Sequence, residues 1–129
     1  KTHEVDAIQG AYFLSPKKVL DKVDWFSEDY FLDGEDIDLC WKIREAGYKI
    51  FYYPKVKILH LKGASKGKNE TKKKVSLANR LKFRMASVNS MEIFYKKFLW
   101  KRYSLPINLL VLTGIKFLKL MRFVRTVLQ

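Results

Sequence analysis

The first part of the chain alternates short apolar runs with glycine, serine and proline. Residues 5–14, Val-Asp-Ala-Ile-Gln-Gly-Ala-Tyr-Phe-Leu, have the apolar and aromatic content of a strand, and Gly10 marks a close approach to the backbone there. Ser15-Pro16 is typical of a helix start, with serine as the N-cap and proline at the first helical position. A short helix through about Lys22 is therefore expected.

A second helix is predicted between two glycines. Residues 24–34 have the composition of a loop rich in aromatic side chains, and Gly34 ends that loop. The stretch Glu35–Ala46 is predicted to be helical, and Gly47 provides its C-terminal stop. Further elements follow: strands at 49–53 and 56–61 split by Pro54, a Gly/Ser/Lys loop at 62–74, and helices at 75–100 and from Pro106 onward.

Cations are spaced evenly among the apolar residues of the last predicted helix. Lys116, Lys119, Arg122 and Arg125 recur every three residues, with mostly apolar side chains between them. This is the pattern of a basic amphipathic helix that lies in a membrane interface. A helix that packs on the rest of the protein, with its lysines in water, has the same pattern. The best candidate for a membrane span, residues 105–115, falls short of the roughly 18–20 apolar residues that a span needs.

Composition places the chain among globular proteins. Its 129 residues are 48% hydrophobic and 30% charged, which excludes a disordered tail, a collagen-like fibre and a low-complexity linker. A single cysteine, Cys40, excludes a disulfide scaffold and a cysteine-rich zinc module. The chain begins at Lys1 without an initiator methionine or a signal-peptide pattern, so we interpret it as a piece of a longer protein.

The charge is unevenly placed along the chain. The net charge is +13, but residues 1–61 hold nine Lys/Arg and eleven Asp/Glu, whereas residues 62–129 hold seventeen Lys/Arg and two Asp/Glu. A basic rear of this kind attracts polyanions such as nucleic acid, anionic lipid or phosphorylated substrates. Residues 1–61 include a dense acidic stretch. Such a cluster binds a cation, takes part in a proton transfer or lies on a solvated face. Its six members are Glu28, Asp29, Asp33, Glu35, Asp36 and Asp38.

Three ordered blocks between Val5 and Ser65 carry a resemblance to a known family. The first is the 5–14 run with its Gly-Ala pair, the second is Tyr30–Lys42 with Glu-Asp-x-Asp-Leu, and the third runs from Ala46-Gly47-Tyr48 through Tyr53-Pro54 to His60-x-x-Gly-x-Ser. Together they resemble the C-terminal half of the catalytic domain of family 2 glycosyltransferases, including the rhamnosyltransferase-like members. The resemblance covers about half of the chain.

The resemblance implies a fold, an activity and two parts. The fold would be α/β, the C-terminal part of a GT-A (Rossmann-like) glycosyltransferase domain. Residues 1–74 would form the acceptor-side half of the catalytic domain, and residues 75–129 a basic helical extension. The activity would be inverting transfer of a sugar from a nucleoside-diphosphate sugar to a hydroxyl of a glycan or lipid-linked acceptor, as in cell-surface polysaccharide synthesis. These residues alone are expected to be inactive.

Asp36 is the candidate general base. Inverting transfer requires a base that takes a proton from the acceptor hydroxyl. Asp36 lies at a predicted helix start, which favours a negative charge, behind a glycine that lets a substrate come close. The resemblance places the family's base at this same acid. The alternative is that Asp36 only caps the helix. Glu35 could orient the acceptor, and Asp38 is expected to pair with Lys42 at the i,i+4 spacing.

The resemblance assigns a metal contact to His60, at the end of the predicted strand 56–61, and the basic loop after it is the candidate for the donor diphosphate. In family members that use a metal, the histidine at the position of His60 completes a site for Mn²⁺ or Mg²⁺ begun by an Asp-x-Asp motif. No such motif, with the nucleotide-binding βαβ unit that precedes it, is present in this chain, because Asp36-Ile37-Asp38 lies in the wrong block. Lys62, Gly63 and Ser65 would form a loop over the diphosphate. A solvated surface loop is the alternative.

The acceptor is expected at glycine and aromatic positions of the front half. Gly10, Ala11 and Tyr12 would line an acceptor groove, because a residue without a side chain lets a sugar approach. Trp25 and Tyr30 are candidates for stacking on a sugar face.

The expected partners follow from the charge and the resemblance. They are a nucleotide-sugar donor, a glycan or lipid-linked acceptor and an anionic membrane surface, without nucleic acid, and an exposed strand edge predicts a homodimer. The location would be peripheral at the cytoplasmic face of the plasma membrane. Two alternatives stay open: a basic module that binds polyanions through charge and aromatic stacking, and a non-catalytic relic of the fold.

Overall fold

The computed structural model describes residues 1–59 and 76–128. The chain forms two compact units, one of Lys1–Asp29 with Glu35–Lys62 and one of Tyr30–Gly34 with Gly63–Gln129. The short segment Tyr30–Gly34 thus belongs to the second unit, although it lies within the first in sequence. His60, Lys62, Gly63 and Ser65, which the sequence nominates for the metal and the diphosphate, lie outside the described residues.

The first unit contains a small antiparallel sheet. Strand β1 (His3–Val5) pairs with β2 (Ile50–Tyr52), and His3 lies opposite Tyr52 and Val5 opposite Ile50. The prediction of a strand over the whole of 5–14 was wrong, as was a strand at 56–59. A strand persists only where a neighbour completes its hydrogen bonds, and beyond these three pairs no second strand lies beside either segment among the described residues.

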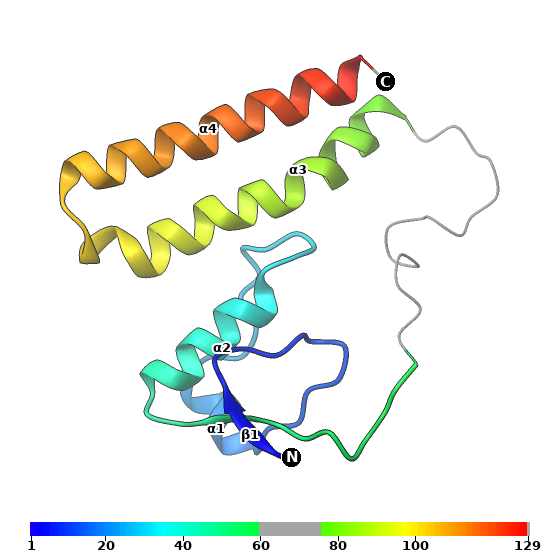
Figure 1. The fold of residues 1–129 in the computed structure, drawn as a ribbon, viewed down its shortest axis with the longest axis vertical. Helices are drawn as coiled ribbons and strands as arrows, with labels where there is room; N and C mark the ends of the chain where they lie inside the picture. Colours follow the sequence, from blue (N-terminus) through cyan, green and yellow to red (C-terminus); the bar gives the residue numbers. More distant parts are fainter. Residues whose placement is uncertain (60–75, 129) are drawn as a thin grey trace. The chain divides into compact units, whose positions relative to one another are not determined.

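Two helices close a hydrophobic core on this sheet (Figure 1). Helix α1 (Lys17–Lys22) and helix α2 (Glu35–Glu45) contribute buried side chains, and β2 adds Ile50. The buried set is Val19, Val23, Leu39, Cys40, Ile43 and Ile50. Ser15 was a wrong prediction for the N-cap of α1, because Pro16 occupies that position with an extended ψ of 135°.

Helix α2 has the ends that its sequence predicts. Its first turn holds Glu35, Asp36 and Asp38 and its last turn holds basic side chains, an order that complements the helix dipole. Gly47 follows the helix with a φ of +86°, and its N–H donates to the carbonyl of Arg44 at 3.0 Å. This left-handed stop is the one that glycine favours.

The second unit is a helical hairpin (Figure 1). Helix α3 (Leu77–Phe94) continues through a π-helical turn, η1 (Tyr95–Leu99), and a 3₁₀ turn, η2 (Trp100–Arg102). Helix α4 (Leu105–Val127) then runs back along α3. The two predicted long helices are confirmed within a few residues at each end. None of the helices in residues 1–59 and 76–128 is both long and apolar enough to cross a membrane.

A buried polar network holds the turn of the hairpin. The Tyr95 hydroxyl donates to Asn108 Oδ1 at 2.7 Å, and Asn108 Nδ2 donates to the carbonyls of Trp100 at 2.9 Å and Tyr103 at 3.1 Å. Asn108 is only 3% exposed, so its amide is satisfied by protein groups rather than by water. These bonds tie the start of η1 and both ends of η2 to the first turn of α4.

Two of the four regularly spaced cations of α4 are directed toward α3. Lys119 Nζ lies 2.5 Å from Glu92 Oε2, and Arg122 Nη1 donates to Ser87 Oγ at 2.5 Å and to the Arg84 carbonyl at 3.0 Å. Residues three apart are offset by about 60° around an α-helix, so a run of them cannot stay on one face. The helix thus packs on another part of the chain, as in the second interpretation of its sequence, but two of its cations contact α3 rather than water alone.

Replacing Glu92 with glutamine is expected to weaken the hairpin. Hydrogen bonds from Lys119 and Lys96 lower the Glu92 pKa from 4.5 to about 2. Because the folded-state pKa lies below the unfolded one, the stabilisation is present above about pH 4.5 and is lost as the pH falls toward 2. We expect Glu92→Gln to lower the free energy of unfolding by about 1–2 kcal/mol at neutral pH, a value reduced for solvent screening. Urea unfolding would measure it.

The pH dependence separates this ion pair from a general effect of charge. In acid, below the range in which Glu92 titrates, the variant and the parent should be equally stable. Glu4→Gln is the matched control, since the Glu4–Lys49 pair has side chains 49% and 67% exposed and should contribute less than about 0.5 kcal/mol. A loss in Glu92→Gln that persists unchanged in acid would contradict the assignment.

Candidate active site

The structure brings two of the three sequence blocks into contact. The backbone N–H of Gly10 donates to Asp36 Oδ2 at 3.1 Å, across 26 residues of sequence. The other carboxylate oxygen, Oδ1, accepts from the Ile37 N–H at 2.8 Å. Asp36 lies in the first turn of α2 and is half-buried. Its carboxylate is thus held in one orientation with one edge open to solvent.

Little space separates the backbone of Gly10 from the Asp36 side chain. A Cβ atom added at Gly10 would lie 3.4 Å from Asp36 Cβ and 3.9 Å from Oδ2, which is close packing without a severe clash. A larger side chain would occupy the space beside the carboxylate. The sequence indicated a close approach at Gly10, and the group that approaches is Asp36.

The neighbouring acids of α2 have different environments. Asp38 is fully buried and pairs with Lys42 at 3.5 Å, which confirms the expected i,i+4 pair in a buried rather than exposed setting. Glu35 Oε2 is also buried, and it accepts no hydrogen bond from the residues that the structure describes. Leaving a carboxylate oxygen buried without a donor costs free energy, and a bound molecule would not reach this atom without a local rearrangement.

Lys42 also fixes the aromatic loop beside α2. Its Nζ donates to the carbonyl of Trp25 at 2.6 Å and to that of Asp24 at 3.4 Å. Asp24 and Trp25 have φ values of 56° and 46°, a left-handed conformation that is strained for residues other than glycine. Such strain persists only where surrounding contacts enforce it, and it is concentrated at binding sites.

Trp25 is anchored at one edge and is partly exposed. The indole Nε1 donates to Asp21 Oδ1 at 3.0 Å, while the residue keeps 45% of its surface exposed. An amphipathic ring held in this way is available for stacking on a sugar. Ala11 and Tyr12 are also exposed, Tyr12 to 51%. These three predicted acceptor residues therefore have accessible surfaces within the first unit.

Tyr30 is a different case, and its assignment as a stacking residue is corrected. It belongs to the second unit and is 8% exposed. A Cβ atom on Gly34 would come within 2.9 Å of Tyr30 Cδ1, so the ring packs directly on that glycine. The sequence shows an aromatic residue in a loop, but it does not show which aromatic residues are covered.

The predicted metal site and diphosphate loop depend on residues that are not described. His60 and the loop residues Lys62, Gly63 and Ser65 fall in that segment. Within the described part of the chain, no three His, Cys, Asp or Glu side chains gather closely enough to hold a metal ion. The described residues therefore supply no ligand set by themselves.

Cys40 does not have the properties of a nucleophile. It is fully buried in the core of the first unit, and its Sγ lies 3.9 Å from the Ile8 carbonyl. Burial raises the pKa of the thiol above 9.0, against a smaller lowering by the Ile8 hydrogen bond. The thiolate is the reactive form, so this cysteine has a packing role.

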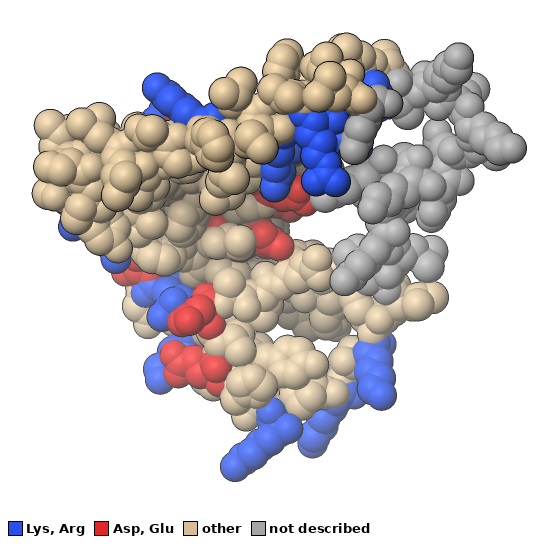
Figure 2. All heavy atoms as spheres, turned by 45° about the horizontal axis from the view of Figure 1, so that its top comes forward, with Lys and Arg blue, Asp and Glu red and all other residues tan. Residues whose placement is uncertain are grey.

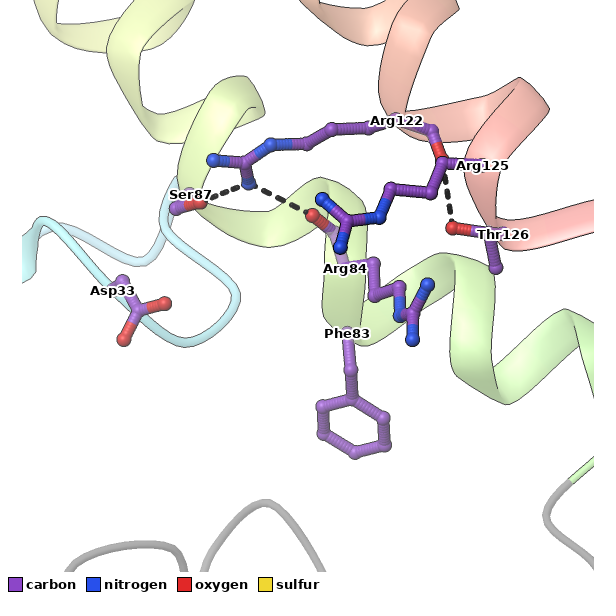
Figure 3. Close-up of a pocket in the computed structure, with 7 residues that line it drawn as sticks. All are labelled: Asp33, Phe83, Arg84, Ser87, Arg122, Arg125 and Thr126. Atoms are coloured by element: carbon purple, nitrogen blue, oxygen red, sulfur yellow. Dashed lines mark hydrogen bonds between the residues drawn. The ribbon is translucent and has the colours of Figure 1, made fainter. Parts of the chain in front are cut away.

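Sequence inspection missed a cavity lined by arginines in the helical unit (Figure 3). Arg84 of α3 and Arg122 and Arg125 of α4 line it with Ser87 and Thr126, and Asp33 contributes from the Tyr30–Gly34 segment. The only signal in the sequence was the basic spacing along α4. The contribution of α3 depends on the register between the helices.

Comparison with known proteins gives one weak relationship. Over 98 residues, 75% of this chain, the sequence is 31% identical to the uncharacterized protein y4gI of Sinorhizobium fredii (strain NBRC 101917 / NGR234). The matched segment spans only 10% of the length of that protein, whose name states no activity. No protein-family model and no solved structure matches the chain.

Proposed function

We propose that this chain is the acceptor-side part of an inverting glycosyltransferase of the GT-A type. The observation that carries the proposal is the hydrogen bond from the Gly10 N–H to the Asp36 carboxylate. Both residues belong to blocks that resemble family 2 glycosyltransferases, and the contact supports the proposal because it joins the candidate base to Gly10, a candidate acceptor-binding residue. A module that binds polyanions gives no reason for that juxtaposition, whereas a relic of the fold would keep it and is separated from the proposal by measuring transfer.

The chemistry assigns one step to Asp36. Its carboxylate takes the proton of an acceptor hydroxyl while that oxygen attacks the anomeric carbon of the donor sugar, and the nucleoside diphosphate leaves from the opposite face. Gly10 holds the carboxylate in place through one oxygen. The donor and its divalent cation, Mn²⁺ or Mg²⁺, would be bound by a segment outside this chain together with His60.

A donor screen on the full-length protein tests this function. Thermal stability and sugar transfer would be measured with UDP-, dTDP- and GDP-sugars, each with and without Mn²⁺. We expect one nucleotide to raise the melting temperature in a metal-dependent way, and His60→Ala to remove the shift. No shift and no transfer with any donor would contradict the proposal.

We further propose that the helical hairpin holds the protein at an anionic membrane surface, at the cytoplasmic face. The supporting observation is the outer side of α4, which is mainly uncharged (Figure 2). Its exposed apolar side chains include Leu110 at 73%, Phe117 at 60% and Leu120 at 58%. Contiguous apolar patches of this kind mark interaction sites. Exposed cations on the same helix, such as Lys116, suit anionic headgroups.

Binding to lipid vesicles tests this contact. The double substitution Leu110→Gln and Phe117→Gln is expected to weaken partitioning onto vesicles of phosphatidylcholine with phosphatidylserine by at least about tenfold, because each side chain contributes about 1.5–3 kcal/mol when buried. Sedimentation with vesicles would measure it. Leu14→Gln is the control, since Leu14 is 80% exposed in the other unit. Equal losses in both variants, or none in either, would refute the membrane contact.

A further inference from the structure

The arginine-lined cavity of the helical unit has the features of a binding site. It has a volume of about 480 Å³. Its walls come from α3, from α4 and from the Tyr30–Gly34 segment, all within the second unit. Figure 3 shows the side chains of Arg84, Arg122 and Arg125 reaching into the same region from the two helices. None of the candidate catalytic residues belongs to this cavity.

The charge around the cavity is strongly one-sided. Among the described residues, three guanidinium groups line it, against one carboxylate, that of Asp33. Arg84 and Arg125 form no ion pair with any described residue, and the side chain of Arg122 contacts Ser87 Oγ and a backbone carbonyl rather than an acid. Like charges gathered in this way repel one another, and an anion placed between them removes that cost.

Arg122 is held in a fixed position while keeping donors for a ligand. Its Nη1 donates both hydrogens, to the Arg84 carbonyl at 3.0 Å and to Ser87 Oγ at 2.5 Å. A guanidinium has five N–H donors, so Nη2 and Nε remain for a planar, two-point contact with an oxyanion. Thr126 supports this arrangement one turn along α4, since its hydroxyl donates to the Arg122 carbonyl at 2.7 Å.

We propose that this cavity binds a phosphate group, with Arg84, Arg122 and Arg125 as its ligands. Arginine is suited to phosphate because its fork of donors matches two oxygens at once. The cavity is larger than one phosphate requires, so a diphosphate or a phosphate ester fits the space. The phosphate can be that of a free ligand or that of a lipid headgroup. This inference does not depend on the proposed transferase activity, because it uses none of the residues of the first unit.

Titration with inorganic pyrophosphate tests the site directly. The full chain would be titrated by calorimetry at fixed ionic strength, and compared with the double variant Arg84→Gln and Arg125→Gln. These two side chains make no hydrogen bond within the described residues, so the fold should survive, which circular dichroism would check. We expect the variant to bind pyrophosphate at least about tenfold more weakly. The control is Lys18→Gln with Lys57→Gln, which removes the same charge from exposed positions of the first unit, outside the cavity and outside the helical hairpin.

A second arm distinguishes the source of the phosphate. Vesicles of phosphatidylcholine with phosphatidate would be sedimented with the same variants. Binding to pyrophosphate that is lost only in the arginine variant supports a site for a soluble phosphate. Binding to phosphatidate alone, lost in the same variant, supports a lipid headgroup. Equal losses in the lysine control, or no dependence on the arginines in either arm, would overturn the proposal.

Discussion

Replacing Asp36 with asparagine is expected to lower sugar transfer by about 10²- to 10⁴-fold, the usual contribution of a general base. Asparagine has nearly the same shape and can still accept the Gly10 N–H through its carbonyl oxygen. The substitution removes the negative charge near the start of α2, and we therefore expect a loss of about 1 kcal/mol or less in the free energy of unfolding. Transfer would be measured on the full-length protein with the donor found in the nucleotide screen.

The control keeps the same kind of change within the acidic stretch. Glu28→Gln removes an exposed carboxylate eight positions before Asp36 and should leave transfer within about twofold of the parent. Activity retained in Asp36→Asn would leave Asp36 with a purely structural role at the helix start. Activity lost equally in both variants would point to the charge of the stretch rather than to one base.

Among the glycines that the structure describes, Gly34 is the one whose replacement with alanine is expected to be most destabilising. Gly34 has a φ of +109°, a conformation that other residues rarely adopt. An added Cβ atom would also lie 2.9 Å from Tyr30 Cδ1 and 3.0 Å from Ser90 Cβ. Backbone strain and overpacking each cost about 1–3 kcal/mol, so we expect a loss of about 2–5 kcal/mol in the free energy of unfolding, measured by urea denaturation.

Gly114→Ala, in the same unit, is instead expected to raise the free energy of unfolding. Gly114 lies inside α4, and a Cβ atom there would meet nothing within 4 Å. Alanine should therefore stabilise the hairpin by about 0.5–1 kcal/mol through its higher helix propensity. A Gly34→Ala variant as stable as the parent would show that the packing of Tyr30, Gly34 and Ser90 is looser than described.

The contact between Gly34 and Ser90 matters because it ties a loop to the helical unit. The Ser90 hydroxyl lies within hydrogen-bond reach of the Asp33 and Ala86 carbonyls, which share its one hydrogen, and Phe31 packs on Phe83 with ring centroids 5.7 Å apart. Asp33 of this segment lines the arginine cavity. We therefore expect disruption at Gly34 to weaken pyrophosphate binding as well as stability.

The residues of the candidate site were predictable from the sequence, but their arrangement in space was not. Gly10 and Asp36 were both nominated from the sequence, for different tasks, and the resemblance carried that choice. Their hydrogen bond joins residues 26 positions apart, and no local pattern indicates such a pair. Trp25 was nominated as an aromatic residue in a loop, whereas the bond from Lys42 to its carbonyl joins residues 17 positions apart and has no local signal.

The sequence by itself determined the helices of this protein. Glycine stops, proline at a helix start and apolar periodicity act within a few residues, and they located α2, α3 and α4 to within a few positions. The tertiary structure alone decided the extent of the strands, the burial of Tyr30, and the arginines that α3 and α4 bring together. Strand pairing, burial and the register of two helices depend on contacts between residues that are distant in sequence, and local preferences do not specify those contacts.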